Sequence, residues 1–134
     1  MPSWTQRGIC PALASRNCRN WRRRSGSWTP ALRGGPIAAG SSRCFAAGGQ
    51  AGIPASAAAV ILNVTAVGYT NLGWLTLFPN GQTLPGSSTV NFDVSEYAIA
   101  NQTIIKLGTS GQLCVNAGNA GSNVILDATG YEAP

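Results

Sequence analysis

One alternating stretch constrains the fold of this chain more than any other feature. Between positions 60 and 67 the sequence reads VILNVTAV, in which Leu62, Val64 and Ala66 alternate with Asn63, Thr65 and Val67. A second alternating run, 74–78, follows a segment of turn-forming residues. A period of two in β-branched and aliphatic residues is typical of half-buried strands. We therefore expect two strands joined as a β-hairpin at the centre of a β-sandwich.

Further short alternating segments follow, separated by turn signals such as Asn80-Gly81 and Pro85-Gly86. We expect strands at 88–93, 101–107, 112–116 and 123–131, one or two short strands within 34–45, and a connection at 94–100 that contains a helical turn. Strands that recur about every ten residues are typical of sandwiches and barrels. The predicted fold is all-β, an antiparallel sandwich of about six to eight short strands with an irregular N-terminal arm.

Length and charge divide the chain into two parts. A length of 134 residues corresponds to about one domain. The net charge of +5 is uneven, because residues 1–45 contain eight of the nine basic residues and no acid. We predict an irregular arm rich in Arg and Trp at 1–33 and a β-sandwich domain at 34–134. The low content of charged residues, 10%, and the many glycines favour an extracellular module over a cytosolic enzyme.

The basic arm has three interpretations. Arg neutralises phosphate and Trp stacks on bases, so the arm could bind nucleic acid or another anionic surface. It could instead be a poorly ordered tail. A third interpretation is an out-of-frame translation of GC-rich DNA, since Arg, Ser, Trp, Pro and Gly occur here without acids. Nucleic-acid binding is the weakest of the functions that we consider.

The cysteines predict disulfides rather than a metal site. The chain has four cysteines and no histidine. Zinc sites use Cys or His at short spacing, and no such cluster occurs. Two disulfides would suit an oxidising compartment. Three pairings of Cys10, Cys18, Cys44 and Cys114 are open at this point.

Several motifs in order resemble a known bacterial module. They are IPASAAAVILNVTAV, GWLTLFPNG, STVNFD, IANQTIIKLGTSGQLCV and NVILDATGY, and the match covers about Gly34–Tyr131. They resemble a β-rich module of secreted and cell-surface proteins of actinobacteria, acidobacteria and related bacteria. The resemblance implies an extracellular location and a binding or adhesive role, and it carries over no catalytic residues. The chain departs from the pattern after Cys18-Arg19, where an Asp-Thr-Arg is missing, and at Glu132, which replaces an aromatic residue.

The sequence predicts no membrane span and no export signal within this chain. No run of about 18 apolar residues is present, as a transmembrane helix would need. The segment 1–24 contains Arg but no continuous apolar stretch, as a signal peptide would have. We expect the protein outside the cell or on the cell surface, with its export signal absent from these residues.

We expect no enzyme and no cofactor. The absence of His excludes a Ser–His or Cys–His pair. Lys106 is more consistent with a solvated lysine than with a general base. Only four acids are present, and Asp127 is better explained as a hydrogen-bond acceptor than as half of a catalytic pair. Asn91, Asp93 and Glu96 offer oxygen ligands, but no calcium-loop motif supports a site.

Aromatic and amide side chains in the expected loops suggest a carbohydrate site. Aromatic rings can stack on sugars, while amides contact hydroxyl groups. The candidate ligand-binding residues are Tyr69, Asn71, Trp74, Asn80, Gln82 and Tyr97. The competing interpretation is that the aromatic residues pack on the sheet and the asparagines form turns. We predict a non-catalytic module for surface attachment or carbohydrate binding, whose partners are glycans or cell-surface polymers. The alternative is a self-associating subunit of a surface fibre or layer.

Overall fold

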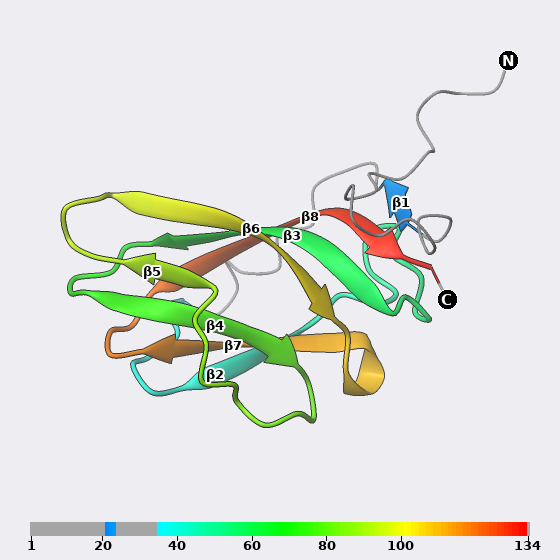
Figure 1. Cartoon of the computed structure of the whole chain (residues 1–134), viewed down its shortest axis with the longest axis horizontal. Coiled ribbons are helices and arrows are strands. Elements are labelled where there is room, and N and C mark those ends of the chain that lie inside the picture. The colour runs from blue at the N-terminus through cyan, green and yellow to red at the C-terminus, as the bar shows by residue number, and fades with distance from the viewer. Residues whose placement is uncertain (1–20, 24–34, 134) are drawn as a thin grey trace, which may run out of the picture.

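The computed structural model describes residues 21–23 and 35–133, and this part of the chain is an antiparallel β-sandwich (Figure 1). The predicted fold class is therefore confirmed. The elements are β1 (Trp21–Arg23), β2 (Ser42–Ala46), β3 (Ala59–Val67), β4 (Gly73–Pro79), β5 (Val90–Phe92), β6 (Ala98–Lys106), the 3-10 turn η3 (Thr109–Gly111), β7 (Gln112–Gly118) and β8 (Asn123–Glu132). One sheet has the order β1-β8-β3-β6 and the other has the order β2-β7-β4-β5.

The first sheet is built on long strands around β3. β3 pairs with β6 along nine positions on one side and with β8 on the other. A register shift between Ile61 and Leu62 marks an irregularity in the β3–β8 ladder. β1 pairs with the last residues of β8. Thus three residues of the arm predicted at 1–33 form a strand, and the remainder of that prediction lies outside the described residues.

The second sheet is built on shorter strands around β7. β7 lies between β2 and β4, and β5 covers only the first part of β4. Cys44 and Cys114 face each other across the β2–β7 ladder and form a disulfide. Of the pairings left open by the sequence, the structure thus contains Cys44–Cys114, while Cys10 and Cys18 lie outside the described residues.

The predicted hairpin of residues 60–78 is wrong. β3 and β4 are strands, but they belong to different sheets, and the connection 68–72 crosses from one sheet to the other. Both strands have a buried face, formed by residues such as Leu62 and Val64 on β3 and Leu75 and Leu77 on β4. These faces meet across the core, where aligned sandwiches bury the inner residues of both sheets. The alternating pattern therefore identified the buried face of each strand correctly, but it did not identify the strands with which each one pairs.

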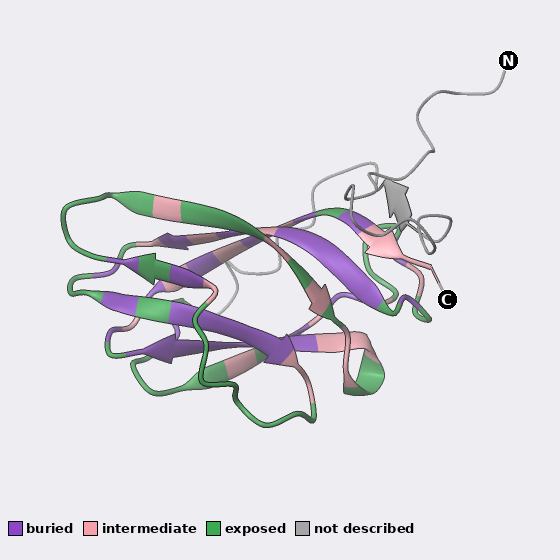
Figure 2. Ribbon diagram, in the orientation of Figure 1, coloured by how far each residue is buried: buried purple, intermediate pink, exposed green. Residues whose placement is uncertain are grey.

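The core lies between the two sheets and follows the predicted alternation (Figure 2). Among the later strands, the residues expected to point inward include Ile105 and Leu107, which are only partly buried. The other expected inward residues are buried, namely Val90, Phe92, Leu113, Val115, Val124, Leu126 and Ala128. Burial of an aliphatic side chain contributes about 1.5–3 kcal/mol, so this shared interior is the main source of stability.

Three predicted boundaries differ from the structure. β6 begins at Ala98, where a connection with a helical turn was expected, and β7 continues to Gly118 through residues expected to form a loop. Of the one or two strands expected within 34–45, one is β2, and Ile37 forms only an isolated bridge to Ser122. Boundaries shift in this way because glycine and small residues fit both strands and loops.

Candidate functional site

The structure divides the six predicted ligand-binding residues between two ends of the sandwich. Tyr69, Asn71 and Trp74 lie before or at the beginning of β4, and Tyr97 lies just before β6 at this same end. Asn80 and Gln82 follow the last residue of β4 and lie at the opposite end. The six residues therefore do not form one site, and each end has to be considered by itself.

Trp74 forms an aromatic platform on the outer face of the second sheet. Its neighbours Gly73 and Leu75 are buried on the core side, whereas Trp74 is 39% exposed. Gly118 is its partner on β7, and a Cβ at position 118 would collide with Cε2 and Nε1 of the indole. The body of the indole thus lies across the glycine, where any side chain would displace it. Gly118 supports one side of the ring system, and the exposed remainder is open to a ligand.

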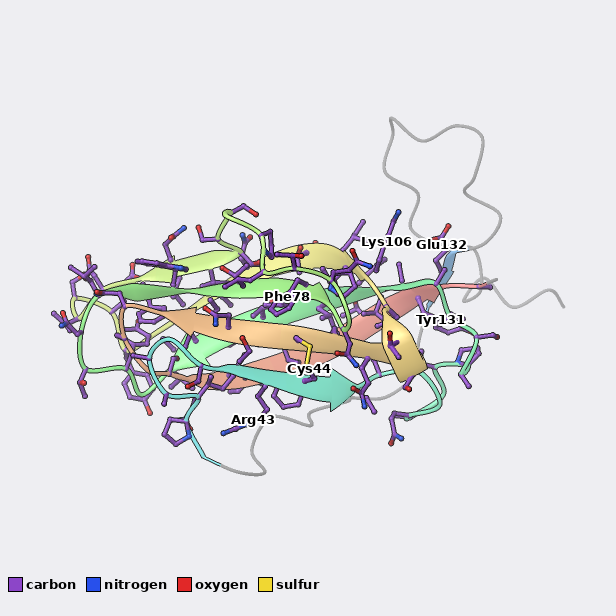
Figure 3. All side chains as sticks on the ribbon, turned by 90° about the horizontal axis from the view of Figure 1, so that it is seen from below. Arg43, Cys44, Phe78, Lys106, Tyr131 and Glu132 are labelled. Atoms are coloured by element: carbon purple, nitrogen blue, oxygen red, sulfur yellow. A yellow bond between two sulfur atoms is a disulfide. The ribbon has the colours of Figure 1, made fainter. Side chains whose placement is uncertain are left out.

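Polar side chains flank the platform on the same face. Asn91 of β5 is directly opposite Trp74 on the other side and is exposed. In the next row along β4 and β7, Thr76 faces Asn116, whose partner on β2 is Ser42. The amide of Asn116 donates to the Ser42 hydroxyl over 2.9 Å and to the Ser41 carbonyl over 3.2 Å. Figure 3 looks onto the outer face of this sheet. Thr76 and Asn116 are buried, and the Thr76 hydroxyl donates to the Ser87 carbonyl. Of the polar residues next to the ring, Asn91 is therefore the one that is exposed to a ligand.

An aromatic pair in the core supports the start of β4. Tyr69 is 9% exposed and stacks on Phe92 with ring centroids 4.3 Å apart. The Tyr69 hydroxyl donates to the Glu96 carbonyl over 2.8 Å, which joins the β3–β4 and β5–β6 connections. Burial, with a contribution from the charges of Glu96 and Asp93, raises the pKa of the Tyr69 phenol. Tyr69 thus positions the platform from inside the sandwich and does not present its ring to a ligand.

The connection before β4 is held by short polar contacts. The Asn71 side-chain oxygen accepts a hydrogen bond from the Leu72 amide over 2.8 Å. Asn119, which follows β7, donates to the Leu72 carbonyl over 2.6 Å. Asn71 and Leu72 are themselves exposed. The amide nitrogen of Asn71 has no hydrogen bond to another described residue, so it remains able to donate to a ligand.

At the opposite end, Asn80 ties a turn to the sheet. Its amide donates to the Gln112 side-chain oxygen over 2.9 Å and to the Thr109 carbonyl over 3.3 Å. Its own oxygen lies 3.8 Å and 3.7 Å from the sulfur atoms of Cys44 and Cys114. A Cβ at the neighbouring Gly108 would collide with the Asn80 backbone. Asn80 is therefore committed to structure at this end.

Gln82 lines a pocket beside the end of β4. The pocket has a volume of about 550 Å³ and lies between the ends of β4 and β6 and the loop that follows β4. Its lining is largely apolar, and it consists of Leu77, Phe78, Pro79, Gln82, Thr83, Pro85, Ile105, Lys106, Leu107 and Gly108. Pockets of roughly 300–1,000 Å³ accommodate a small ligand or a large side chain.

The Asp93 carboxyl is held by hydrogen bonds from a neighbouring residue. The Ser95 hydroxyl and backbone amide both donate to Asp93, and these bonds lower the pKa of the Asp93 carboxyl. Among residues 21–23 and 35–133, no group of three or more His, Cys, Asp or Glu is placed to hold a metal ion. In the same described part, no helix is long and apolar enough to cross a membrane. Asp127 lies on the first sheet, opposite Asn63.

Sequence reasoning found Trp74 but missed the two residues that define its setting. Gly118 was assigned to a loop because it lies in a run of Ala, Gly, Asn and Ser. Asn91 was considered only as an oxygen ligand for calcium. One signal was present: position 118 continues the outward alternation of 112, 114 and 116, and a glycine in a strand often marks a close approach.

Comparisons with known proteins add no relative to this picture. No model of a known protein family matches the chain. No curated protein matches it either. The functional interpretation therefore depends on the residues and their geometry.

Proposed function

We propose that this domain is a non-catalytic, extracellular module that binds carbohydrate polymers through the Trp74 platform. The observation that carries the proposal is the indole resting on Gly118 with 39% of the residue exposed. Hexopyranose rings have an apolar face of C–H groups and a rim of hydroxyls. A partly exposed aromatic ring fits the apolar face, and nearby amides and hydroxyls fit the rim.

The arrangement also favours an extended ligand. The indole lies on the outer surface of the sheet with the exposed Asn91 beside it, whereas Thr76 and Asn116 in the next row are buried. An exposed face of this kind accommodates a chain that runs past the site, whereas a single small sugar would need a deeper enclosure. The disulfide of Cys44 and Cys114 fits the oxidising compartment in which such polymers occur. The resemblance to secreted bacterial modules supports the same proposal.

Polysaccharide binding with matched variants tests this proposal. The wild-type protein is incubated with insoluble cellulose, xylan, chitin and purified peptidoglycan, and the bound fraction is measured. We expect at least one polymer to be bound, and Trp74→Ala to weaken that binding about tenfold or more, as loss of a stacked aromatic contact does. Tyr97→Ala removes a more exposed aromatic residue outside the platform and should leave binding unchanged.

A second variant tests whether the position of the indole, and not only its presence, is needed for binding. Gly118→Ala keeps Trp74 but places a Cβ where the indole now lies, so binding should fall although no aromatic residue has been removed. Circular dichroism confirms that each variant is folded. The proposal is refuted if the wild-type protein binds none of the four polymers, or if Trp74→Ala binds as well as the wild type does.

A further inference from the structure

The two sheets end in edges of very different character. β6 is the outermost strand of the first sheet and pairs only with β3 among the described strands. It is nine residues long and contains no Pro or Gly, and its one charged residue, Lys106, is at its end. The outermost strands β1 and β5 have three residues each, and β2 has five. Proteins usually protect edges with short strands, prolines, bulges or charges. β6 has little of this protection.

β6 is also exposed along most of its length (Figure 2). Its outer face includes Ile104, which is 48% exposed. On the inner side, the Asn101 side chain donates to the Thr89 carbonyl over 3.0 Å, and this contact anchors the strand to the second sheet. The strand is thus held in an extended conformation, and pairing with another strand would require no reorganisation of its backbone.

We propose that β6 pairs antiparallel with β6 of a second copy of this chain, in a register centred on Gln102. This register pairs β6 along its whole length and keeps inner-face residues opposite inner-face residues. Ile99 then faces Ile105, and Asn101 faces Thr103. A shift by one residue would place the inner face of one strand against the outer face of the other, which pairing across a sandwich edge disfavours.

Charge and side-chain type agree with the same register. Lys106 faces Ala98 of the second copy, so the two lysines do not meet. Gln102 faces its own equivalent at the two-fold axis, where two amide groups can bond to each other. Contacts between identical strands of this kind are isologous, and they form a closed dimer.

The pocket and an exposed aromatic residue complete the contact. In the same register, Tyr97 of each copy lies opposite Leu107 of the other. Leu107 lines the 550 Å³ pocket together with Ile105 and Gly108. Tyr97 is 88% exposed and directly precedes β6. The dimer thus brings a large exposed aromatic residue to the mouth of an apolar pocket, twice by symmetry.

A charge exchange at the two-fold axis tests the register. Sedimentation equilibrium over a concentration series should show a weak wild-type dimer, because nine residues a side is fewer than the roughly 20–30 of a standard interface. Gln102→Lys alone and Gln102→Glu alone should be monomeric, since each places like charges in contact. An equimolar mixture of the two should form a heterodimer. Asn63→Lys changes the neighbouring amide on β3, one strand inside the edge, and should dimerise as the wild type does.

Two further variants test the contact at Tyr97. Tyr97→Ala should weaken dimerisation about tenfold, as removal of a buried aromatic residue does. Val94→Ala, which alters another exposed residue of the same connection, should have little effect. Trp74→Ala should dimerise normally, so that failure of carbohydrate binding and failure of this inference remain distinguishable. A wild-type monomer at millimolar concentration, dimeric Gln102→Lys, or no recovery in the mixture overturns the proposal. Unchanged dimerisation of Tyr97→Ala overturns its pocket contact.

Discussion

Different interactions stabilise the strands within each of the two sheets of this sandwich. In the first sheet, β3, β6 and β8 have nine, nine and ten residues and are joined by long, nearly continuous ladders. In the second sheet the longest strands have seven residues, and β5 has three. The shorter ladders are supplemented by a disulfide and by side-chain hydrogen bonds from the loops. Length stabilises one sheet, and cross-links stabilise the other.

This contrast also separates the proposed activities. The cross-linked sheet carries the Trp74 platform, whose position depends on a close approach between β4 and β7. Fixed geometry of this sort benefits from covalent and polar ties around it. The long-stranded sheet instead presents an edge whose backbone is already extended. The second sheet thus provides the rigid face around Trp74, and the first sheet provides the exposed edge along β6.

The largest expected effect tests whether the two sheets fold as one unit. Leu62→Ala in β3 and Leu113→Ala in β7 each remove a fully buried side chain from the shared core. Each should lower the free energy of unfolding by about 2–5 kcal/mol, because both leave a cavity between the sheets. Urea unfolding followed by tryptophan fluorescence and by far-ultraviolet circular dichroism gives this measurement. Two separate transitions in either variant would show that the sheets unfold independently.

Removal of the disulfide should distinguish the sheets. The double substitution Cys44→Ala, Cys114→Ala opens a link between residues 70 apart in sequence and should cost about 2–4 kcal/mol. Unlike a reductant, it leaves Cys10 and Cys18 unchanged. Amide hydrogen exchange should show a greater loss of protection in β2 and β7 than in β3 and β8. An equal loss of protection in both sheets would contradict the conclusion that the disulfide mainly stabilises the second sheet.

The sequence predicted which face of each strand is buried better than it predicted which strands pair with each other. Alternation correctly placed Leu62 with Val64 and Leu75 with Leu77 on one face of each strand, and all four are buried, because burial acts on each side chain locally. It could not show that β3 and β4 lie in different sheets, since a short connection with turn residues serves both a hairpin and a crossing between sheets. The Cys44–Cys114 pair was equally undetermined, because it depends on β2 lying beside β7. Sheet order is a property of the whole chain.

The candidate site was predicted in part for a related reason. The residue type identified Trp74, but only the structure shows what lies beneath its ring. Gly118 contributes by lacking a side chain, and sequence reasoning gave such a residue no role beyond a turn. Tyr69 and Trp74 are close in sequence and chemically similar, yet one is buried against Phe92 and the other is exposed. The presence of an aromatic residue in the sequence therefore does not show whether it packs in the core or is exposed to a ligand.

A smaller effect is expected where a loop is tied to the cross-linked sheet. Asn80→Ala removes the hydrogen bonds to Gln112 and Thr109 and should lower the free energy of unfolding by about 1–2 kcal/mol. Gln82→Ala, two residues further on, alters an exposed side chain and should change stability by less than about 0.5 kcal/mol. Thermal unfolding of both variants supplies the comparison. Equal melting temperatures would show that the Asn80 bonds contribute nothing.

The smallest effect concerns the connection between the sheets. Hydrogen bonds from Ser95 lower the pKa of Asp93 from its ordinary value of 3.8. A carboxyl with a lowered folded-state pKa stabilises the protein above its unfolded-state pKa, and this contribution disappears as the pH falls through the folded-state value. Ser95→Ala removes the hydroxyl donor and should raise the Asp93 pKa towards 3.8, measured by carbon-13 NMR of the carboxyl group. Because Asp93 is exposed, the unfolding curve at neutral pH should hardly move. A pKa that does not rise in Ser95→Ala would show that the backbone amide of residue 95 suffices, and the connection would then be fixed by its backbone alone.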